Sequence, residues 1–194
     1  MSLFRKPGYK NEMAGISSPG MLYDRYAPTL LGLCKRYCGN LEDAEDVLHD
    51  GFIKALQNLG NFTPRENGSF EGWMKRIMVN TALNHLRNKS KEKNLFSFVT
   101  QGNDAFPDDA GEDPQFFTEI SGKVSKEELM SMICNLPHGY RTVFNLYVFE
   151  SYSHKEISET LGCTENTSKS QLSKARSMLR KQLNHIVVQI TEQR

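Results

Sequence analysis

Hydroxyl, amide and cationic side chains gather between residues 164 and 176 of this 194-residue chain. Amides and hydroxyls can hydrogen-bond the edges of nucleic-acid bases, whereas lysine and arginine neutralise phosphates. Apolar residues recur at helical spacing through the same segment, which predicts a helix with one apolar face and an opposite face available to a partner. The apolar residues are Leu172, Ala175, Leu179 and Leu183. The candidate base- and phosphate-contacting residues are Thr164, Asn166, Thr167, Lys169, Ser170, Gln171, Ser173, Lys174 and Arg176.

A helix-turn-helix would position this basic helix. Ser153 and Glu156 have the spacing of a capping box, which predicts that a preceding helix begins at Ser153. Gly162 ends that helix, because glycine adopts the left-handed conformation without steric cost, and Thr164 can cap the next one. In a helix-turn-helix the second helix enters the major groove with its N-terminal residues over the bases. An ordinary helical hairpin with a solvated basic face is the alternative.

A cluster of acids lies near the N-terminus, on a predicted helix that begins near Leu41. Apolar residues of this helix follow the i, i+3, i+4, i+7 rule, and the acids lie off that stripe, so one face is core and the other is strongly negative. An acid pair such as Asp46 and Asp50 could hold a divalent ion in a nuclease, but we favour a solvated or partner-binding face. The acids are Glu42, Asp43, Glu45, Asp46 and Asp50.

A loop at residues 60–69 and a helix that starts near Phe70 combine aromatic and polar residues. Cations of this kind can hold phosphates while an aromatic loop receives unstacked bases, which is how single-stranded nucleic acid is bound. The alternative is that Phe62, Phe70 and Trp73 belong to the core, which we favour for Trp73 and hold evenly open for Phe62. The predicted polar surface of the helix comprises Lys75, Arg76, Asn80, Asn84, Arg87 and Lys89.

Composition limits the remaining possibilities. Nearly equal counts of bases (24) and acids (23) give a net charge of +1, which suits one or two small soluble domains. We find no apolar run of membrane-spanning length and no signal-peptide pattern, so we expect a cytoplasmic protein without membrane insertion. We also find no paired nucleophile and histidine and no glycine-rich phosphate loop, so we expect neither an enzyme nor a bound cofactor.

The four cysteines are expected to be reduced thiols. Cys34 and Cys38 are one helical turn apart and could hold a metal with two further ligands. Since His49 and His85 stand alone in the sequence, we favour two buried small side chains over a zinc site, and we expect no metal.

The predicted fold class is all-α, with two small helical domains joined by a flexible acidic linker. Residues 1–20 are rich in glycine, serine, proline and lysine and predict a flexible arm. Residues 21–91 predict a first helical domain whose first helix ends at the Gly39-Asn40 pair. Residues 92–124 predict the linker. Residues 125–190 predict the second domain, which begins with a capping box and has a helix break at Leu136-Pro137.

Three segments together resemble the extracytoplasmic-function class of RNA polymerase sigma factors. The first resembles that family's polymerase-binding helices, the second its promoter-melting helix and the third its C-terminal domain with an LP step at Leu136-Pro137. Their order and spacing match the family over nearly everything from Leu22 to Leu183. The segments read LYDRYAPTLLGLCKRYCGNLEDAEDVLHDGFIKAL, FEGWMKRIMVNTALNHLRNK and NLPHGYRTVFNLYVFESYSHKEISETLGCTENTSKSQLSKARSMLRK.

The resemblance implies binding of the core of bacterial RNA polymerase through Asp43, Glu45, Asp46, His49 and Asp50. It implies binding of the minus-ten promoter element, with a flipped base, through Phe62, Arg65, Ser69, Lys75, Arg76, Asn80, Asn84, Arg87 and Lys89. The residues at 164–176 named above would recognise the minus-thirty-five element. The acidic linker would thread the polymerase's nucleic-acid channel, and an anti-sigma factor is a further expected partner.

Some positions differ from the common family pattern. Ser168 occupies a recognition-helix position that is more often apolar, and Gln171 and Ser173 replace residues that are frequently basic or aromatic. The alternative function is a freestanding helix-turn-helix transcriptional regulator, which would bind duplex DNA tightly without polymerase.

Overall fold

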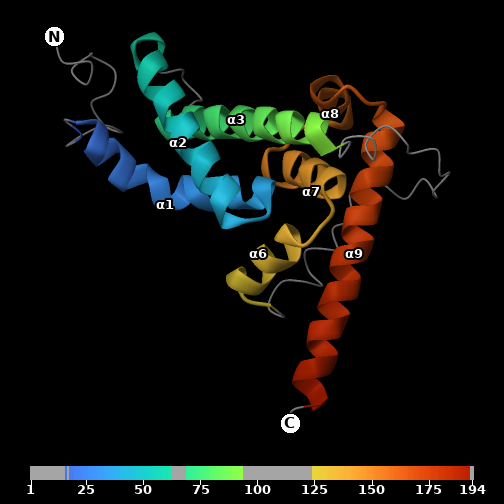
Figure 1. Ribbon diagram of the computed structural model, residues 1–194. Helices are drawn as coiled ribbons and strands as arrows, with labels where there is room; N and C mark the ends of the chain where they lie inside the picture. Colours follow the sequence, from blue (N-terminus) through green and yellow to red (C-terminus); the bar gives the residue numbers. More distant parts are fainter. Residues whose placement is uncertain (1–15, 17, 63–68, 94–123, 193–194) are drawn as a thin grey trace. The chain divides into compact units, whose positions relative to one another are not determined.

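The computed structural model describes residues 16, 18–62, 69–93 and 124–192 (Figure 1). Every regular element among these residues is a helix, so the predicted all-α class is confirmed. The chain divides into two compact units, Met1–Asn88 and Lys89–Arg194. Nearly all of the predicted arm and linker, together with Arg65, lie outside the described residues. The exact domain limits given above therefore stay predictions.

The first unit is built from α1 (Pro19–Cys38), α2 (Leu41–Asn58), the short 3-10 turn η2 (Leu59–Asn61) and α3 (Phe70–Lys93). Ser18 begins α1, since its Oγ accepts the backbone N–H of Met21 at 3.3 Å. Gly39 ends the helix with a φ of 83°, as the sequence predicted, because a left-handed residue favours glycine. Asn40 then caps α2, so α1 and α2 form a tight hairpin (Figure 1).

The core of the first unit lies among these three helices. Leu22 and Leu30 of α1, Val47 of α2 and Met74 of α3 are among its fully buried side chains. Gly51 of α2 lies against the thioether of Met78 in α3, where a Cβ atom would collide with that side chain. The absence of a side chain at this position therefore lets the two helices approach closely.

The second unit contains α6 (Lys126–Cys134), α7 (His138–Phe144), a π turn labelled η3 (Asn145–Phe149), α8 (His154–Leu161) and α9 (Glu165–Glu192). The capping box predicted at Ser125 is present: Ser125 accepts the N–H of Glu128 at 3.1 Å and donates its own N–H to the Glu128 carboxylate at 2.7 Å. The hydrogen bond from the Ser125 N–H, and secondarily one with the Ser125 side chain, lowers the pKa of the Glu128 carboxyl below its ordinary value.

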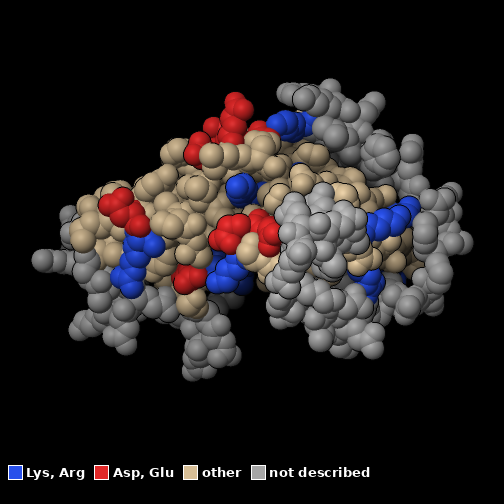
Figure 2. All heavy atoms as spheres, turned by 90° about the horizontal axis from the view of Figure 1, so that it is seen from below, with Lys and Arg blue, Asp and Glu red and all other residues tan. Residues whose placement is uncertain are grey.

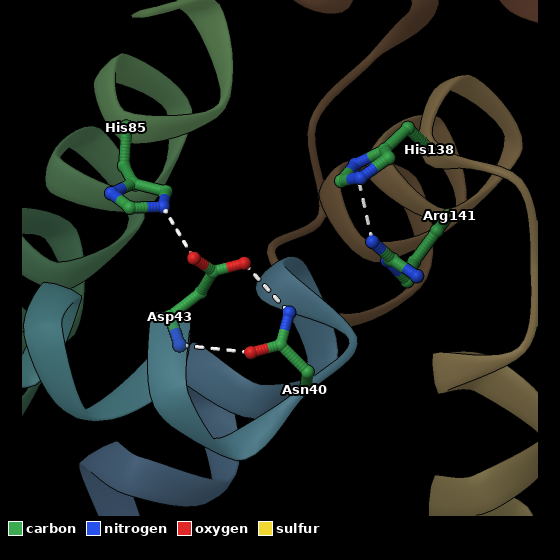
Figure 3. Close-up of polar contacts among 5 residues, drawn as sticks. All are labelled: Asn40, Asp43, His85, His138 and Arg141. Atoms are coloured by element: carbon green, nitrogen blue, oxygen red, sulfur yellow. Dashed lines mark hydrogen bonds and ion pairs between the residues drawn. The ribbon is translucent and has the colours of Figure 1, made fainter. Parts of the chain in front are cut away.

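The side chain of Arg141 in α7 bonds the backbone at the end of α6. Its buried guanidinium donates to the carbonyl oxygens of Cys134 at 2.6 Å and Leu136 at 3.1 Å, which the end of α6 leaves without helical partners. It also contacts Nδ1 of His138 at 3.1 Å (Figure 3). The break predicted at Leu136-Pro137 is thus confirmed, and a buried cation satisfies the carbonyls that the break exposes.

Apolar residues at helical spacing, Tyr147 and Val148 among them, predict a helix over residues 140–149. The structure differs from this prediction in the last turn. The N–H of Glu150 bonds the carbonyl of Asn145 at 3.2 Å, which widens the turn, and Ser151 then has a φ of 59°. We expected Tyr147 and Val148 to pack inward, but both are half-buried and Leu146 is fully buried instead. A wider turn accounts for this, because it shifts which position faces the core.

Candidate functional site

The acidic surface of α2 is formed by the carboxylates that point away from the core. Glu42, Glu45, Asp46 and Asp50 are exposed, and His49 is exposed beside them with its ring stacked on Tyr23, the centroids 6.0 Å apart. Figure 2 shows acidic and basic side chains in several small groups on one face of the molecule, so the small net charge hides local charge. A helix face of this kind can attract a cationic partner.

Asp43 has a different role from its acidic neighbours. Its carboxylate accepts a hydrogen bond from the amide of Asn40 at 2.6 Å and lies 3.2 Å from Nε2 of His85 in α3 (Figure 3). The Asp43 and His85 side chains are only 14% and 27% exposed. The backbone N–H of Asp43 also donates to Asn40 Oδ1 at 2.9 Å. Asp43 therefore joins the start of α2 to α3, and its carboxylate is engaged inside the unit.

The polar surface of α3 forms a stripe along one face of the helix. Arg76, Asn80 and Asn84 are exposed at intervals of four residues, and half-buried Arg87 donates from Nη1 to Asn84 Oδ1 at 3.1 Å. Lys75 is half-buried and forms an ion pair with Glu71 at 2.7 Å, and Lys89 is half-buried near the end of the helix. The stripe combines amides and cations, the groups that contact bases and phosphates.

An aromatic cluster lies at the start of α3. The ring of Phe62 packs against Phe70 at 5.3 Å and Trp73 at 5.2 Å between centroids, and Phe70 contacts Tyr26 at 5.5 Å. Phe70 is buried, whereas Phe62 and Trp73 are half-buried. The core alternative therefore fits Phe70 fully, and the other two rings remain partly exposed.

Ser69 has a structural role at the start of α3. Its hydroxyl accepts the backbone N–H of Gly72 at 2.9 Å, and its carbonyl accepts the N–H of Trp73 at 3.1 Å. Ser69 is therefore the N-cap of α3, and this bond satisfies a donor at the helix start.

The helix-turn-helix of the second unit has the predicted boundaries. Ser153 accepts the N–H of Glu156 at 3.2 Å, and the Glu156 carboxylate accepts the N–H and hydroxyl of Ser153 at 2.8 and 2.7 Å. The two bonds that the carboxylate accepts, first that from the Ser153 N–H and then that from its hydroxyl, lower the pKa of the Glu156 carboxyl. Gly162 ends α8 with a φ of 69°, and Thr164 caps α9 by accepting the N–H of Thr167 at 3.0 Å. Each of these expectations is confirmed.

The accessible part of α9 is narrower than the sequence suggested. Thr164 and Asn166 are exposed, and the half-buried group is Lys169, Ser170, Ser173 and Lys174. Thr167, Gln171 and Arg176 are buried, Gln171 and Arg176 being only 2% and 5% exposed. The expectation that Gln171 and Arg176 lie on the free face is therefore wrong, and Thr167, a predicted DNA contact, is buried as well. They follow the spacing of Leu172, Ala175 and Leu179, so the inward stripe contains polar as well as apolar residues.

Arg176 contacts the π turn, since its guanidinium lies over the ring of Tyr147, 5.9 Å from the centroid. The same ring stacks on His154, with centroids 4.7 Å apart. Nδ1 of His154 is 2.9 Å from the hydroxyl of Ser168, which is fully buried. The sequence analysis did not identify His154 as a functional residue. The one available indication was Ser168, which occupies a position that is more often apolar in the family that the sequence resembles.

The cysteines of α1 are buried thiols. Cys34 and Cys38 lie within the core. Burial, and secondarily the nearby Cys38, raises the pKa of Cys34 to about 12, so Cys34 stays protonated and unreactive at neutral pH. Within the described ranges, no cluster of three or more histidine, cysteine or acidic side chains could hold a metal ion. No helix among those residues has both the length and the apolarity needed to cross a membrane.

Comparisons with known proteins agree in both units. Residues 22–92 match the family described as Sigma-70 region 2, and residues 126–179 match Sigma-70, region 4. The chain is 30% identical over 174 residues to the RNA polymerase sigma-H factor of Pseudomonas aeruginosa, covering 86% of each chain. It is 30% identical over 172 residues to the ECF RNA polymerase sigma factor SigW of Bacillus subtilis, covering 85% of this chain and 88% of SigW.

Among solved structures, the chain is similar to the sigma factor RpoE of Bartonella quintana, crystallised with the anti-sigma factor NepR. The sequence identity is 19% and the TM-score is 0.48, over 85% of this chain and 96% of that one.

Proposed function

Since this chain belongs to the ECF-type RNA polymerase sigma factors and directs RNA polymerase to promoters, we propose that its surfaces divide that task among them. The acidic surface of α2 binds the polymerase core. The polar stripe of α3 binds the minus-ten element, and the first three turns of α9 bind the minus-thirty-five element. As a sigma factor the chain is a non-catalytic subunit, so each surface acts by binding alone.

Polymerase binding by α2 is supported by the exposure of Glu45, Asp46, His49 and Asp50 on one face. A protein that binds DNA has little use for a strongly negative helix unless that helix faces a cationic protein surface. Complementary charge would speed the encounter and fix the register of the two surfaces. Asp43 contributes indirectly, because its bonds to Asn40 and His85 hold the start of α2 in place.

Minus-ten binding by α3 is supported by the alignment of Arg76, Asn80, Asn84 and Arg87 along one stripe. Cations at both ends of the stripe can hold the strand by its phosphates, and the amides between them can bond exposed base edges. Phe62 and Trp73 are only half-buried, so these rings could contact an unpaired base. Arg65, Ser69, Lys75 and Lys89 complete the proposed set from the sequence.

Minus-thirty-five binding by α9 is supported by the position of Asn166, Lys169, Ser170, Ser173 and Lys174 on the accessible side of the helix. The first turns of a recognition helix are the part that reaches base edges in the major groove. Thr164 is exposed but its hydroxyl caps the helix. The burial of Thr167, Gln171 and Arg176 argues that these residues support the helix from behind.

The observation that carries the proposal is the presence, on one chain, of an exposed acidic helix face and of two solvent-accessible faces that carry cations and amides. Run-off transcription with purified bacterial core polymerase tests it. We expect a discrete promoter-dependent transcript when the chain is added and none without it. A chain that binds promoter duplex tightly by itself, and adds no transcript, would instead fit the freestanding regulator, which family membership argues against.

Two further features are proposed from family membership. We expect the protein to act in the cytoplasm, where RNA polymerase and DNA are. We also expect an anti-sigma factor among its partners, which co-purification of the tagged chain from its own cells would identify.

A further inference from the structure

The imidazole of His154 links the two helices of the helix-turn-helix. His154 is the first residue of α8, and its Nδ1 shares a hydrogen bond with the hydroxyl of Ser168 at 2.9 Å. Ser168 lies in the first turn of α9 and is fully buried. The imidazole also stacks on Tyr147, with an angle of 24° between the rings. One side chain therefore joins the π turn, α8 and the start of α9.

The position of Ser168 gives this bond its importance. Asn166, Lys169 and Ser170 lie within two residues of Ser168 on the same turn of α9. A hydrogen bond is directional, whereas an apolar contact allows sliding and rotation. The bond to His154 therefore restricts rotation of α9 about its own axis, and with it the direction of the three accessible side chains.

We propose that His154 is a positioning residue for promoter recognition, because its bond to Ser168 sets the orientation of the DNA-facing turn of α9. This inference rests on the proposed binding of the minus-thirty-five element by α9. It names a residue that does not itself touch DNA.

The surroundings of His154 favour a neutral imidazole. Nε2 is buried and has no hydrogen-bond partner among the residues that the structure describes, so a proton there would have no acceptor. Burial lowers the pKa of His154 below its ordinary 6.5, and the charges of Lys169 and Arg176 on α9 lower it further. Glu165 opposes this shift, Tyr147 contributes a neutral ring, and the flanking Lys155 and Glu156 are exposed.

The direction of the pH effect follows from linkage. Below pH 6.5, a histidine in the unfolded or undocked state takes up a proton. The docked His154 has a lower pKa and stays neutral, so the docked state is destabilised as the pH falls. The effect starts near 6.5, grows as the pH falls toward the lowered pKa and then stops growing. Promoter binding should therefore have an acid limb that depends on His154.

The experiment measures the affinity of assembled holoenzyme for a duplex that the wild-type holoenzyme has selected from a randomised promoter library. Affinity is compared at about pH 8 and about pH 6, where a histidine changes charge. His154→Ala and Ser168→Ala should each weaken binding at about pH 8 by roughly fivefold, the effect of one lost hydrogen bond. His154→Gln can still bond Ser168 and does not titrate, so it should bind as wild type at the higher pH and lose the acid limb.

His185→Gln is the matched control, because His185 is an exposed histidine of the same helix, and it should keep the wild-type acid limb. Circular dichroism establishes that each variant is folded at the assay temperature. An unchanged acid limb in His154→Gln, or wild-type affinity in Ser168→Ala, overturns the inference while wild-type binding still supports the function proposed for α9. If wild-type holoenzyme selects no duplex, this inference and the function proposed for α9 are both overturned.

Discussion

Asp43 and Asp46 are three residues apart on α2, yet their carboxylates have different surroundings. Asp46 is exposed, whereas Asp43 contacts Asn40 and His85 within the first unit. Charge alone therefore does not define the surface proposed to bind polymerase. A carboxylate that already has partners gains less from a new cation than one that faces water.

Reversal of charge at the exposed acids tests this distinction. Asp46→Lys combined with Asp50→Lys should weaken assembly with core polymerase by roughly tenfold or more, because two attractive contacts become repulsive. Fluorescence anisotropy of the labelled chain with core polymerase measures the change. Asp24→Lys, an exposed acid of α1, is the control and should assemble as wild type. Unchanged assembly by the double variant would contradict the assignment of α2.

The basic residues of α9 also differ in burial, since Lys169 and Lys174 are half-buried and Arg176 is buried. Lys169→Ala with Lys174→Ala should weaken holoenzyme binding to promoter DNA and lower the slope of log affinity against log salt, by about 0.9 for each lost phosphate contact. Arg176→Ala should leave that slope unchanged and instead lower the thermal stability of the protein, since the guanidinium is buried against Tyr147. A salt slope that changes for Arg176 and not for the lysines would reverse the assignment.

At the scale of helices, capping side chains determine where α1, α2, α3, α6, α8 and α9 begin. Ser69, Ser125, Ser153 and Thr164 each accept a backbone N–H in the first turn of a helix. Ser69 and Thr164 also belong to the proposed DNA-contacting sets. A loss of DNA binding on their substitution therefore has to be separated from a loss of helix structure.

The start of α2 offers a clear test of a structural acid. Asp43→Ala removes the contacts with Asn40 and His85, so it should lower the free energy of unfolding by about 1 kcal/mol, whereas Asp46→Ala should have little effect. Chemical denaturation followed by circular dichroism measures both. Polymerase affinity of folded Asp43→Ala should stay near that of wild type. A large loss of polymerase affinity without loss of stability would show that Asp43 contacts polymerase directly.

At the scale of the whole molecule, the two units carry different proposed contacts and are joined by one chain. Such covalent connection raises the effective concentration of the second contact once the first has formed. The proposed function thus predicts that promoter recognition by holoenzyme requires the acidic surface and the basic α9 surface on the same molecule.

Mixing two defective chains tests that requirement. The Asp46→Lys, Asp50→Lys variant and the Lys169→Ala, Lys174→Ala variant should each give little run-off transcript, and their mixture should give no more than the better of the two. The reason is that neither chain has both surfaces, and binding through separate chains gains nothing from the connection. Full recovery in the mixture would show that the two surfaces work independently.

The sequence by itself determined the class of fold and the family, because both depend on local signals. Helix starts at Ser125 and Ser153, stops at Gly39 and Gly162, and the apolar stripe of α2 are short-range patterns that backbone chemistry enforces. The three segments that resemble a sigma factor are likewise contiguous in the chain.

Tertiary structure decided which polar side chains remain accessible. Asp43, Gln171 and Arg176 are polar or charged like their more accessible neighbours, and only their contacts with His85, the second unit's core and Tyr147 distinguish them. The bond between His154 and Ser168 joins residues 14 positions apart across a turn. Periodicity gives the direction of a side chain from its own helix, but burial depends on what another helix places opposite it.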